Sequence, residues 1–403
     1  MSGLLGKFKR DAGRYGWSYA LRRGIAYTFD PTRGHHELDW NYYGSIELTP
    51  ERTSWNQRPL TRPTKKPSIA WIVSDMDIGS GGHTTLFRLA YYLERAGHPT
   101  TIYVHGKTKY GTPEEFRRVV REHFFPLEAH VIFGADKLEP CDVAVATTWF
   151  TAYPLYASDA PQRKAYLVQD YEPWFYPKSS EYLMIENTYR MGFYGICVGP
   201  WLAATLRQRF GMQTSHFLLA ADDNYHEDPA TEREAETVCA YVRPATPRRA
   251  FQFAVQALRH LKRMRPQTKV VLYGADLAGI PTPVEHESLG ILTPKQLGAL
   301  YRRSTVGLSL SLTNYSLIPQ EMMACGLPVV ELDGETTRAV FKDGQDLLLA
   351  PSDPVAVAKK LAQVLDDKAL QDKLRAGGKK FVSDISWDKA GVAVARAIEQ
   401  LSH

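Results

Sequence analysis

Runs of apolar residues alternate with amphipathic helical patterns along most of the chain. Between residues 67 and 221, segments typical of buried strands are separated by segments in which apolar residues recur every three or four positions. Residues 84–98, for example, put Leu86, Leu89 and Leu93 on one face of a helix. Strands separated by helices predict a parallel, doubly wound α/β sheet. The expected strands of this first set are 68–74, 99–104, 128–133, 142–149, 164–169 and 194–199.

A second alternating set begins at residue 237, after a polar stretch at 222–236 that is the best candidate for a linker. The chain of 403 residues is long enough for two such domains. We therefore expect an N-terminal extension at 1–66, one Rossmann-like domain at 67–221 and a second one at 237–385. The expected strands of the second set are 237–242, 268–274, 306–312, 327–332 and 345–350.

The stretch from Thr305 to Leu332 carries the most information. Apolar and small or polar residues alternate over 306–312, which predicts a strand. A helix follows, for which Asn314 or Ser316 can cap the start and Gly326 can mark the end. A strand that feeds a helix presents free N–H groups at the carboxyl edge of a sheet, where open α/β folds receive anions.

Composition and charge narrow the class of protein. The hydrophobic content of 44% and the charged content of 23% are those of a soluble globular protein. The four cysteines lie far apart without metal-ligand spacing, which suits a reducing compartment. We see no signal peptide and no apolar run of about 18 residues. The sequence therefore predicts a cytoplasmic protein.

The net charge of +5 is concentrated at the N-terminus. Residues 1–27 carry six basic residues and one acidic residue, which accounts for the whole excess. The rest of the chain is formally neutral, which argues against a nucleic-acid partner. The basic segment also contains Leu, Phe, Tyr and Trp, so it predicts peripheral contact with the inner face of a membrane. The alternative is an extension packed on the main domain.

Three arginines follow the strand at 237–242. Arg243, Arg248 and Arg249 lie between this strand and the next helix. Arginine binds phosphate oxygens through charge-assisted and often bidentate hydrogen bonds, each worth about 1.5–3 kcal/mol. The segment is a candidate diphosphate clamp, and a solvated turn is the alternative.

A glycine-rich turn follows the first strand. Gly81 and Gly82 allow backbone to approach a ligand closely, and the helix expected from Thr84 offers N–H groups. His83 is either a hydrogen-bonding group on the acceptor side or a residue that merely starts the helix. Asp75 and Asp77 imitate an Asp-x-Asp metal motif, but they lack further acidic partners, so we interpret them as local caps and expect no metal.

The stretch around Glu321 resembles the donor-site signature of the family 4 glycosyltransferases, which are retaining enzymes of the GT-B fold. In that signature a Glu, seven residues and a second Glu precede small-x-small-Gly-x-Pro-Val. Glu321 matches the second Glu and residues 323–329 match the tail, but Thr313 stands where the first Glu is expected. The resemblance implies two doubly wound domains facing each other across a cleft, and a final helix at 386–403 that returns to the first domain.

Further motifs look like those of rhamnosyltransferases of bacterial cell-surface glycans, which use dTDP-β-L-rhamnose. They are GSGGHTT at 79–85, RPATPRR at 243–249 and QDYEPWF at 169–175, in which carboxylates and aromatic rings could form a sugar-binding wall. The implied donor-binding residues are Gly81, Gly82, His83, Asp170, Tyr273, Gly274, Ile291, Leu292, Thr313, Tyr315, Ser316, Leu317 and Glu321, with Arg243, Arg248 and Arg249 as the catalytic arginines.

The resemblance implies transfer of a sugar from a nucleotide sugar to a glycan acceptor, which could be lipid-linked, without cofactor or metal. The arginines would stabilise the leaving diphosphate. Thr313 leaves open which group meets the hydroxyls of the donor sugar. The alternatives are a GT-B enzyme that uses a UDP- or GDP-sugar, a nucleotide-sugar epimerase, a sugar-binding protein without catalysis and an inactive glycosyltransferase-like scaffold.

Overall fold

The structure is a computed structural model that describes residues 40–403. Its first eight residues, with helix α3 (Trp40–Gly44), belong to one unit of the chain, and Leu48–His403 form a second unit that contains both sheets. The basic segment 1–27, and with it the predicted membrane contact, lies outside the described residues.

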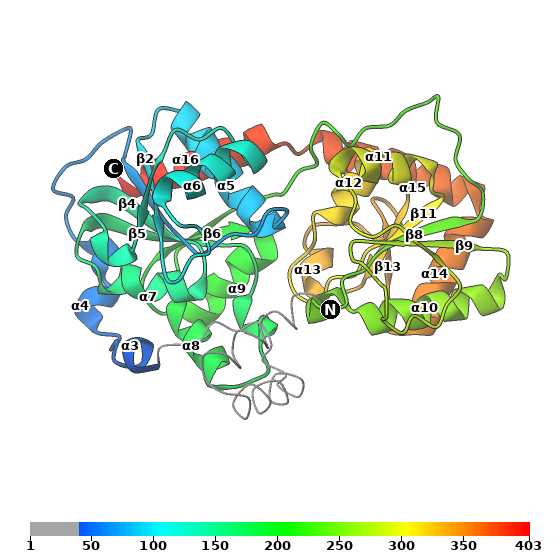
Figure 1. Ribbon diagram of the computed structural model, residues 1–403, viewed down its shortest axis with the longest axis horizontal. Helices are drawn as coiled ribbons and strands as arrows, with labels where there is room; N and C mark the ends of the chain where they lie inside the picture. Colours follow the sequence, from blue (N-terminus) through cyan, green and yellow to red (C-terminus); the bar gives the residue numbers. More distant parts are fainter. Residues whose placement is uncertain (1–39) are drawn as a thin grey trace. The chain divides into compact units, whose positions relative to one another are not determined.

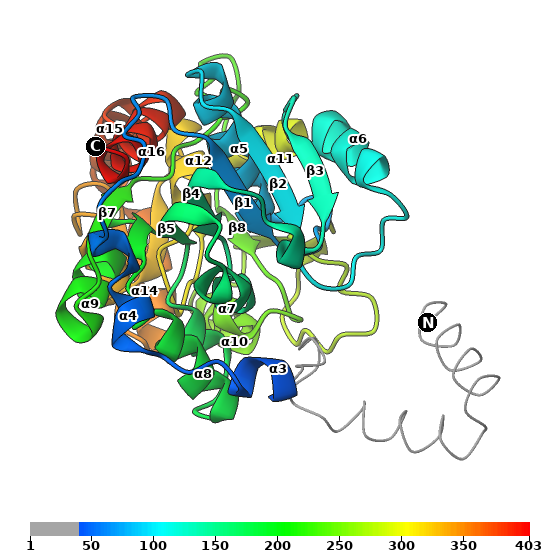
Figure 2. The same cartoon turned by 90° about the vertical axis from the view of Figure 1, so that its left-hand side faces the viewer.

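The first sheet has seven strands (Figure 1). In chain order they are β1 (Ile69–Val73), β2 (Thr100–Val104), β3 (His130–Phe133), β4 (Cys141–Ala146), β5 (Pro161–Val168), β6 (Tyr194–Val198) and β7 (Thr214–Phe217). They lie in the order β3-β2-β1-β4-β5-β6-β7 and all pairs are parallel; Figure 2 shows β1, β2 and β3 side by side. The order reverses between β1 and β4, as in a doubly wound fold.

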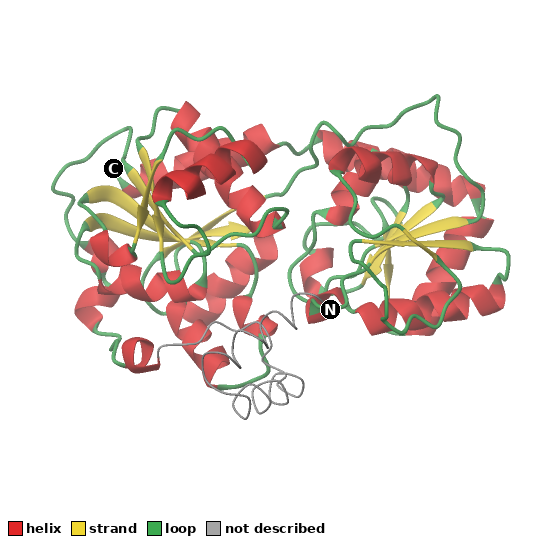
Figure 3. Ribbon diagram, viewed as in Figure 1, coloured by secondary structure: helices red, strands yellow, loops and turns green. Residues whose placement is uncertain are grey.

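Helices cover both faces of this sheet (Figure 3). They are α5 (Gly81–Arg95), α6 (Pro113–His123), α7 (Trp149–Ala157), α8 (Ser180–Thr188) and α9 (Pro200–Phe210). With both faces covered, every residue of β1 is buried, which explains why the strands have continuous apolar sequences. The edge strand β7 was not predicted because three of its four residues are polar and partly accessible.

The second sheet repeats this arrangement with six parallel strands. They are β8 (Thr237–Tyr241), β9 (Lys269–Tyr273), β10 (Glu287–Ser288), β11 (Val306–Leu308), β12 (Val329–Leu332) and β13 (Leu348–Ala350), in the order β10-β9-β8-β11-β12-β13. Its helices are α10 (Phe251–Met264), α11 (Pro294–Arg303), α12 (Ile318–Ala324), α13 (Glu335–Arg338), α14 (Pro354–Asp366) and α15 (Lys368–Ser383). The prediction of two doubly wound Rossmann-like domains is confirmed.

Several predicted boundaries differ from the structure, and two of the differences lie close to candidate site residues. The strand expected over 306–312 ends at Leu308, since the chain then leaves the sheet and exposes Leu312. The helix expected from Thr84 begins at Gly81, so Gly81, Gly82 and His83 form its first turn. Periodicity missed this turn because glycine contributes no side chain to an apolar face.

The last helix, α16 (Trp387–Leu401), follows the second sheet in sequence but packs on elements of the first. The Arg88 guanidinium of α5 lies 4.3 Å from the centroid of the Trp387 ring. Gly391 faces Tyr92 of α5 so closely that a Cβ atom there would lie 2.9 Å from its ring. Arg163 of β5 donates a hydrogen bond to the carbonyl of Leu401 (3.0 Å).

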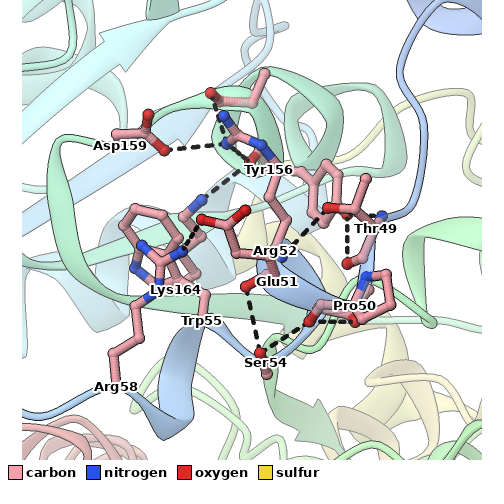
Figure 4. A network of polar contacts seen from close by, with 12 residues as sticks. Thr49, Pro50, Glu51, Arg52, Ser54, Trp55, Arg58, Tyr156, Asp159 and Lys164 are labelled. Carbon is pink, nitrogen blue, oxygen red and sulfur yellow. Dashed lines mark hydrogen bonds and ion pairs between the residues drawn. The ribbon is translucent and has the colours of Figure 1, made fainter.

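Residues 48–66, which the sequence groups with the extension, also pack on the first sheet (Figure 4). The buried Trp55 donates through Nε1 to the carbonyl of Pro161 (3.0 Å), and the Thr49 N–H donates to the Tyr156 hydroxyl (2.9 Å). Beneath Trp55 lies Lys164, whose side chain is fully buried.

In the part of the chain that the structure describes, no carboxylate contacts the Lys164 ammonium directly. Its Nζ donates to the carbonyl of Tyr156 (2.9 Å) and lies 3.9 Å from the centroid of the Trp55 ring, a cation–π contact. Burial lowers the pKa of Lys164 to about 7, and Arg52 nearby acts in the same direction. Burial of an uncompensated charge costs free energy, so this lysine titrates near neutral pH.

The change Lys164→Met should stabilise the protein less at high pH than at neutral pH. Between the folded pKa near 7 and the ordinary value of 10.5, the unfolded chain holds a proton that the folded chain has released. Wild-type stability should therefore rise with pH, by up to about 1.4 kcal/mol per pH unit from this group. The free energy of unfolding of Lys164→Met relative to wild type should fall from pH 7 to pH 9.

Urea unfolding at pH 7, 8 and 9 measures this difference. The matched control is Lys295→Met, which removes an exposed lysine and should show no such trend. A difference between Lys164→Met and wild type that stays constant over the three pH values would contradict the prediction.

Candidate functional site

The reversal of strand order in the second sheet lies between β8 and β11. The segments that leave these two strands at their carboxyl ends, 242–250 and 309–317, therefore meet at one edge of the sheet. The Leu312 N–H donates to the carbonyl of Arg248 (3.0 Å), which joins the two segments directly. The candidate arginines and the residue at 313 thus become neighbours through topology.

The three arginines lie in different surroundings within the first segment. Arg243 is exposed, whereas Arg248 and Arg249 are half-buried in a short 3₁₀ turn. Ala250, the next residue, has φ +48°, a left-handed conformation that is rare outside glycine and asparagine. The backbone at this turn is therefore strained, as is common where a segment is shaped for binding.

Arg248 reaches toward the first sheet. Its guanidinium lies 4.4 Å from the centroid of the Phe175 ring. Burial lowers the pKa of Arg248, and the carboxylate of Asp170 opposes that shift. The Arg248 cation thus lies against an aromatic ring, the Asp170 carboxylate is close enough to act on its pKa, and the other two arginines lie close enough to lower that pKa further.

Arg249 faces inward toward a carboxylate that sequence reasoning missed. Glu331 of β12 is completely buried and accepts hydrogen bonds from the N–H groups of Ser311 (3.0 Å) and Leu332 (2.9 Å). Burial raises the pKa of Glu331 to about 8, and Arg249 partly opposes this shift. Glu331 therefore supports the segment that follows β11. The signal in the sequence was an acidic residue inside the apolar run VVEL.

Glu321 lies in α12 and is 7% exposed. Burial, followed by the charge of Asp222, raises the pKa of Glu321 to about 8, while a hydrogen bond from Tyr225 lowers it. Among the described residues, none makes a hydrogen bond to its buried Oε2 atom. An unpaired carboxylate oxygen is suited to accept a hydrogen bond from a ligand hydroxyl.

The predicted N-terminal caps of α12 are wrong, whereas Gly326, with φ +67°, follows the end of the helix as predicted. The residue before the helix is Leu317, which offers no side-chain cap, and Ser316 reaches only the N–H of Ile318 (3.3 Å). Asn314 turns away from the helix and donates through Nδ2 to the carbonyls of Gln169 (3.1 Å) and Val198 (2.8 Å). Contacts with the first sheet therefore outweigh local capping.

Thr313 and Asp170 meet directly. The Thr313 hydroxyl donates to Oδ2 of Asp170 (2.7 Å), and the Asn314 N–H donates to Oδ1 (2.9 Å). Asp170 follows β5, so these bonds join the carboxyl edges of the two sheets. Burial raises the pKa of Asp170, and the bond from Thr313 is the largest opposing influence.

Two residues of the predicted donor site have buried side chains. Tyr315 is buried, its hydroxyl accepts the Leu219 N–H (3.0 Å), and its ring fills the space where a Cβ of Gly199 would lie. Tyr273 is also buried, and its hydroxyl pairs with that of Tyr301 (2.9 Å). Both side chains pack inside the protein, and contact of either residue with the donor stays a prediction.

The predicted base-reading loop is only partly free to bind. The Gly274 N–H donates to the carbonyl of Gly290 (2.8 Å), so that donor is already used. Ile291 is strongly exposed, whereas Leu292 packs partly buried against the core. Base contact by this loop stays a prediction.

The first turn of α5 lies against the segment after β5. Gln169 donates through Nε2 to the carbonyl of Gly82 (3.0 Å). His83 is hydrogen-bonded to the hydroxyls of Ser80 (3.0 Å) and Ser74 (3.4 Å), and burial lowers its pKa. Its two nitrogens therefore already have partners, which favours the interpretation as a residue of the helix start.

Asp75 and Asp77 contact neighbouring side chains. Asp75 accepts the hydroxyl of Thr108 (2.8 Å), and Asp77 pairs with Lys109. Within residues 40–403, no group of three or more His, Cys, Asp or Glu side chains could hold a metal ion. In the same range, no helix is both long and apolar enough to cross a membrane.

Two sequence families match the chain. The family described as "WsaF, C-terminal domain" matches residues 236–362, and "WsaF, N-terminal domain" matches residues 134–198. The O-antigen biosynthesis protein RfbC of Myxococcus xanthus is 34% identical over 261 residues, which cover 62% of this chain and 20% of RfbC. The D-inositol 3-phosphate glycosyltransferase of Salinispora tropica is 27% identical over 204 residues, which cover 44% of this chain and 42% of that protein. The chain therefore spans less than half the length of these relatives.

Solved structures agree on the fold. Sucrose-phosphate synthase from Thermosynechococcus elongatus superimposes with a TM-score of 0.64 at 15% identity, over 83% of this chain and 98% of that one. Anabaena HepE in complex with UDP-glucose superimposes with a TM-score of 0.63 at 15% identity, over the same shares. These neighbours are GT-B glycosyltransferases, so the chain has the GT-B fold.

If Glu321 binds ligand hydroxyls, nucleotide affinity should rise with pH. Its pKa of about 8 means that the carboxyl is mostly protonated at pH 7 and ionised at pH 9. An ionised carboxylate accepts stronger hydrogen bonds. Affinity for dTDP, measured by calorimetry, should increase severalfold from pH 7 to pH 9 in the wild type and change less in Glu321→Gln.

The exposed Glu232→Gln variant is the control and should follow the wild type. An identical pH dependence in wild type and Glu321→Gln would remove Glu321 from the binding site.

Proposed function

We propose that the protein is a retaining glycosyltransferase that moves rhamnose from dTDP-β-L-rhamnose to a growing cell-surface glycan. The observation that carries this proposal is the meeting of Arg243, Arg248 and Arg249 with the segment after β11 at the switch point of a GT-B sheet. Cationic side chains at this edge are suited to a nucleotide diphosphate.

The glycan class and the donor are supported by different observations. The similarity to RfbC, an O-antigen biosynthesis protein, supports a role in cell-surface glycan synthesis. The rhamnosyl donor rests on the resemblance of the motifs at 79–85, 169–175 and 243–249. The acceptor is proposed to be a glycan, lipid-linked or free.

In the proposed reaction, the bond between the anomeric carbon and the diphosphate oxygen breaks, and its electron pair stays on that oxygen. The arginines stabilise this developing charge. A hydroxyl oxygen of the acceptor forms the new bond on the same face, and its proton passes to the leaving diphosphate. Transfer by this route requires no metal and no side chain that acts as a general base.

The donor is tested by thermal unfolding of the purified protein with dTDP, UDP, GDP or ADP, without added metal. A ligand that binds only the folded state raises the melting temperature. We expect a shift with dTDP alone, followed by transfer from dTDP-rhamnose. A shift with UDP or GDP alone would mean that the donor is a UDP- or GDP-sugar and not dTDP-rhamnose. No shift with any nucleotide would overturn the proposed site.

Arg243→Ala should lower turnover by orders of magnitude while the fold stays intact. Arg243 is exposed, so its loss removes charge at the diphosphate without opening a cavity. Turnover with dTDP-rhamnose and the melting temperature are measured for each variant. The matched control is Arg263→Ala, an exposed arginine at the far end of α10, which should behave as wild type. Near-normal turnover in Arg243→Ala would contradict the proposal that Arg243 belongs to a diphosphate clamp.

A further inference from the structure

The family signature expects a carboxylate at position 313, where this chain has threonine. In the structure that position nevertheless contacts a carboxylate, because the Thr313 hydroxyl donates to Oδ2 of Asp170 (2.7 Å). Asp170 comes from the other sheet, two residues beyond the end of β5. A carboxylate therefore lies next to position 313 in the structure, although the residue at that position of the motif carries none.

We propose that Asp170 takes the place of the missing glutamate and accepts hydrogen bonds from the hydroxyls of the donor sugar. This inference rests on the proposed glycosyl transfer and names a residue that determines recognition of the sugar. The second sheet would then bind the nucleotide and diphosphate, and the first sheet would supply a carboxylate to the sugar.

The position of Asp170 fits this role. It is the carboxylate that acts most strongly on Arg248, one of the two half-buried arginines of the proposed clamp. A group next to the diphosphate is near the anomeric carbon, since the sugar is attached to the second phosphate. The carboxylate of Asp170 is thus close to the expected site of the sugar.

Asp170 also keeps capacity to accept another hydrogen bond. Oδ1 receives the N–H groups of Tyr171 (2.8 Å) and Asn314 (2.9 Å), whereas within residues 40–403 Oδ2 receives only the Thr313 hydroxyl. Each carboxylate oxygen has two lone pairs, so Oδ2 has one unfilled. Asp170 is half-buried rather than sealed in the core.

The alternative is that Asp170 only holds the two sheets together. Other bonds already do this, since Asn314 Nδ2 donates to the carbonyls of Gln169 and Val198, and the Tyr315 hydroxyl accepts the Leu219 N–H. The Thr313 hydroxyl requires an acceptor but not a charged one. A structural role would therefore be largely preserved in Asp170→Asn, and a sugar-binding role would not.

The first test compares wild type with Asp170→Asn. We expect dTDP affinity and melting temperature to remain close to wild type, and kcat/KM for dTDP-rhamnose to fall at least about tenfold, as for loss of a charged hydrogen bond. Affinity for dTDP-rhamnose relative to dTDP should fall as well. Unchanged transfer and sugar-dependent affinity would overturn the inference.

The second test moves the carboxylate back to the position in the signature. Asp170→Ala should lose activity. The double variant Asp170→Ala/Thr313→Glu should be at least about tenfold more active than Asp170→Ala. If the double variant folds but is no more active than Asp170→Ala, the proposal that Asp170 takes the place of the missing glutamate is contradicted. If the double variant does not fold, the result with Asp170→Asn decides the question.

The two proposals fail in different ways. If the wild type binds no nucleotide and transfers no sugar, the proposed function is wrong. If the wild type transfers sugar and Asp170→Asn does so equally well, only the role of Asp170 is wrong.

Discussion

Parallel strand pairing is the constraint on which the rest of the structure depends. Parallel strands need crossover connections, so every strand of a sheet ends at the same edge, and the segments that leave there are free to differ. In the second sheet the order reverses between β8 and β11, which separates two neighbouring connections onto opposite faces. The arginine segment and the Thr313 segment meet at that point, joined by the bond from Leu312 to Arg248.

Buried carboxylates mark this edge of the second sheet. Burial raises the pKa values of Glu321 and Glu331 to about 8 in each case. Such groups cost stability, and a fold retains them where they have a task. Glu331 accepts hydrogen bonds from two backbone N–H groups and lies near Arg249. These contacts indicate that Glu331 supports the structure of this edge. Among the described residues, Oε2 of Glu321 and Oε2 of Glu331 both lack a hydrogen-bond partner. Glu321 is the candidate to meet a ligand because it also occupies the second Glu position of the donor-site signature.

The contacts between the two sheets use polar side chains from both. Asp170, Thr313 and Asn314 connect the segments after β5 and β11, and Tyr315 reaches the backbone beyond β7. A site built in this way depends on both sheets at once. The buried Lys164 beneath Trp55 is a separate feature of the first sheet, where residues 48–66 contact the first half of β5.

The sequence by itself determined the two doubly wound sheets, because continuous apolar strands between amphipathic helices have few other stable arrangements. It also indicated the arginines and Glu321, whose residue types and spacing fit a local motif. Only the tertiary structure revealed the burial of Tyr273 and Tyr315, the role of Glu331 and the meeting of Asp170 with Thr313. Those features depend on residues that lie 20 to 143 positions apart in the chain or on packing against other elements. Hydrophobic periodicity reports which face of an element is buried, but it does not identify the partner that covers it.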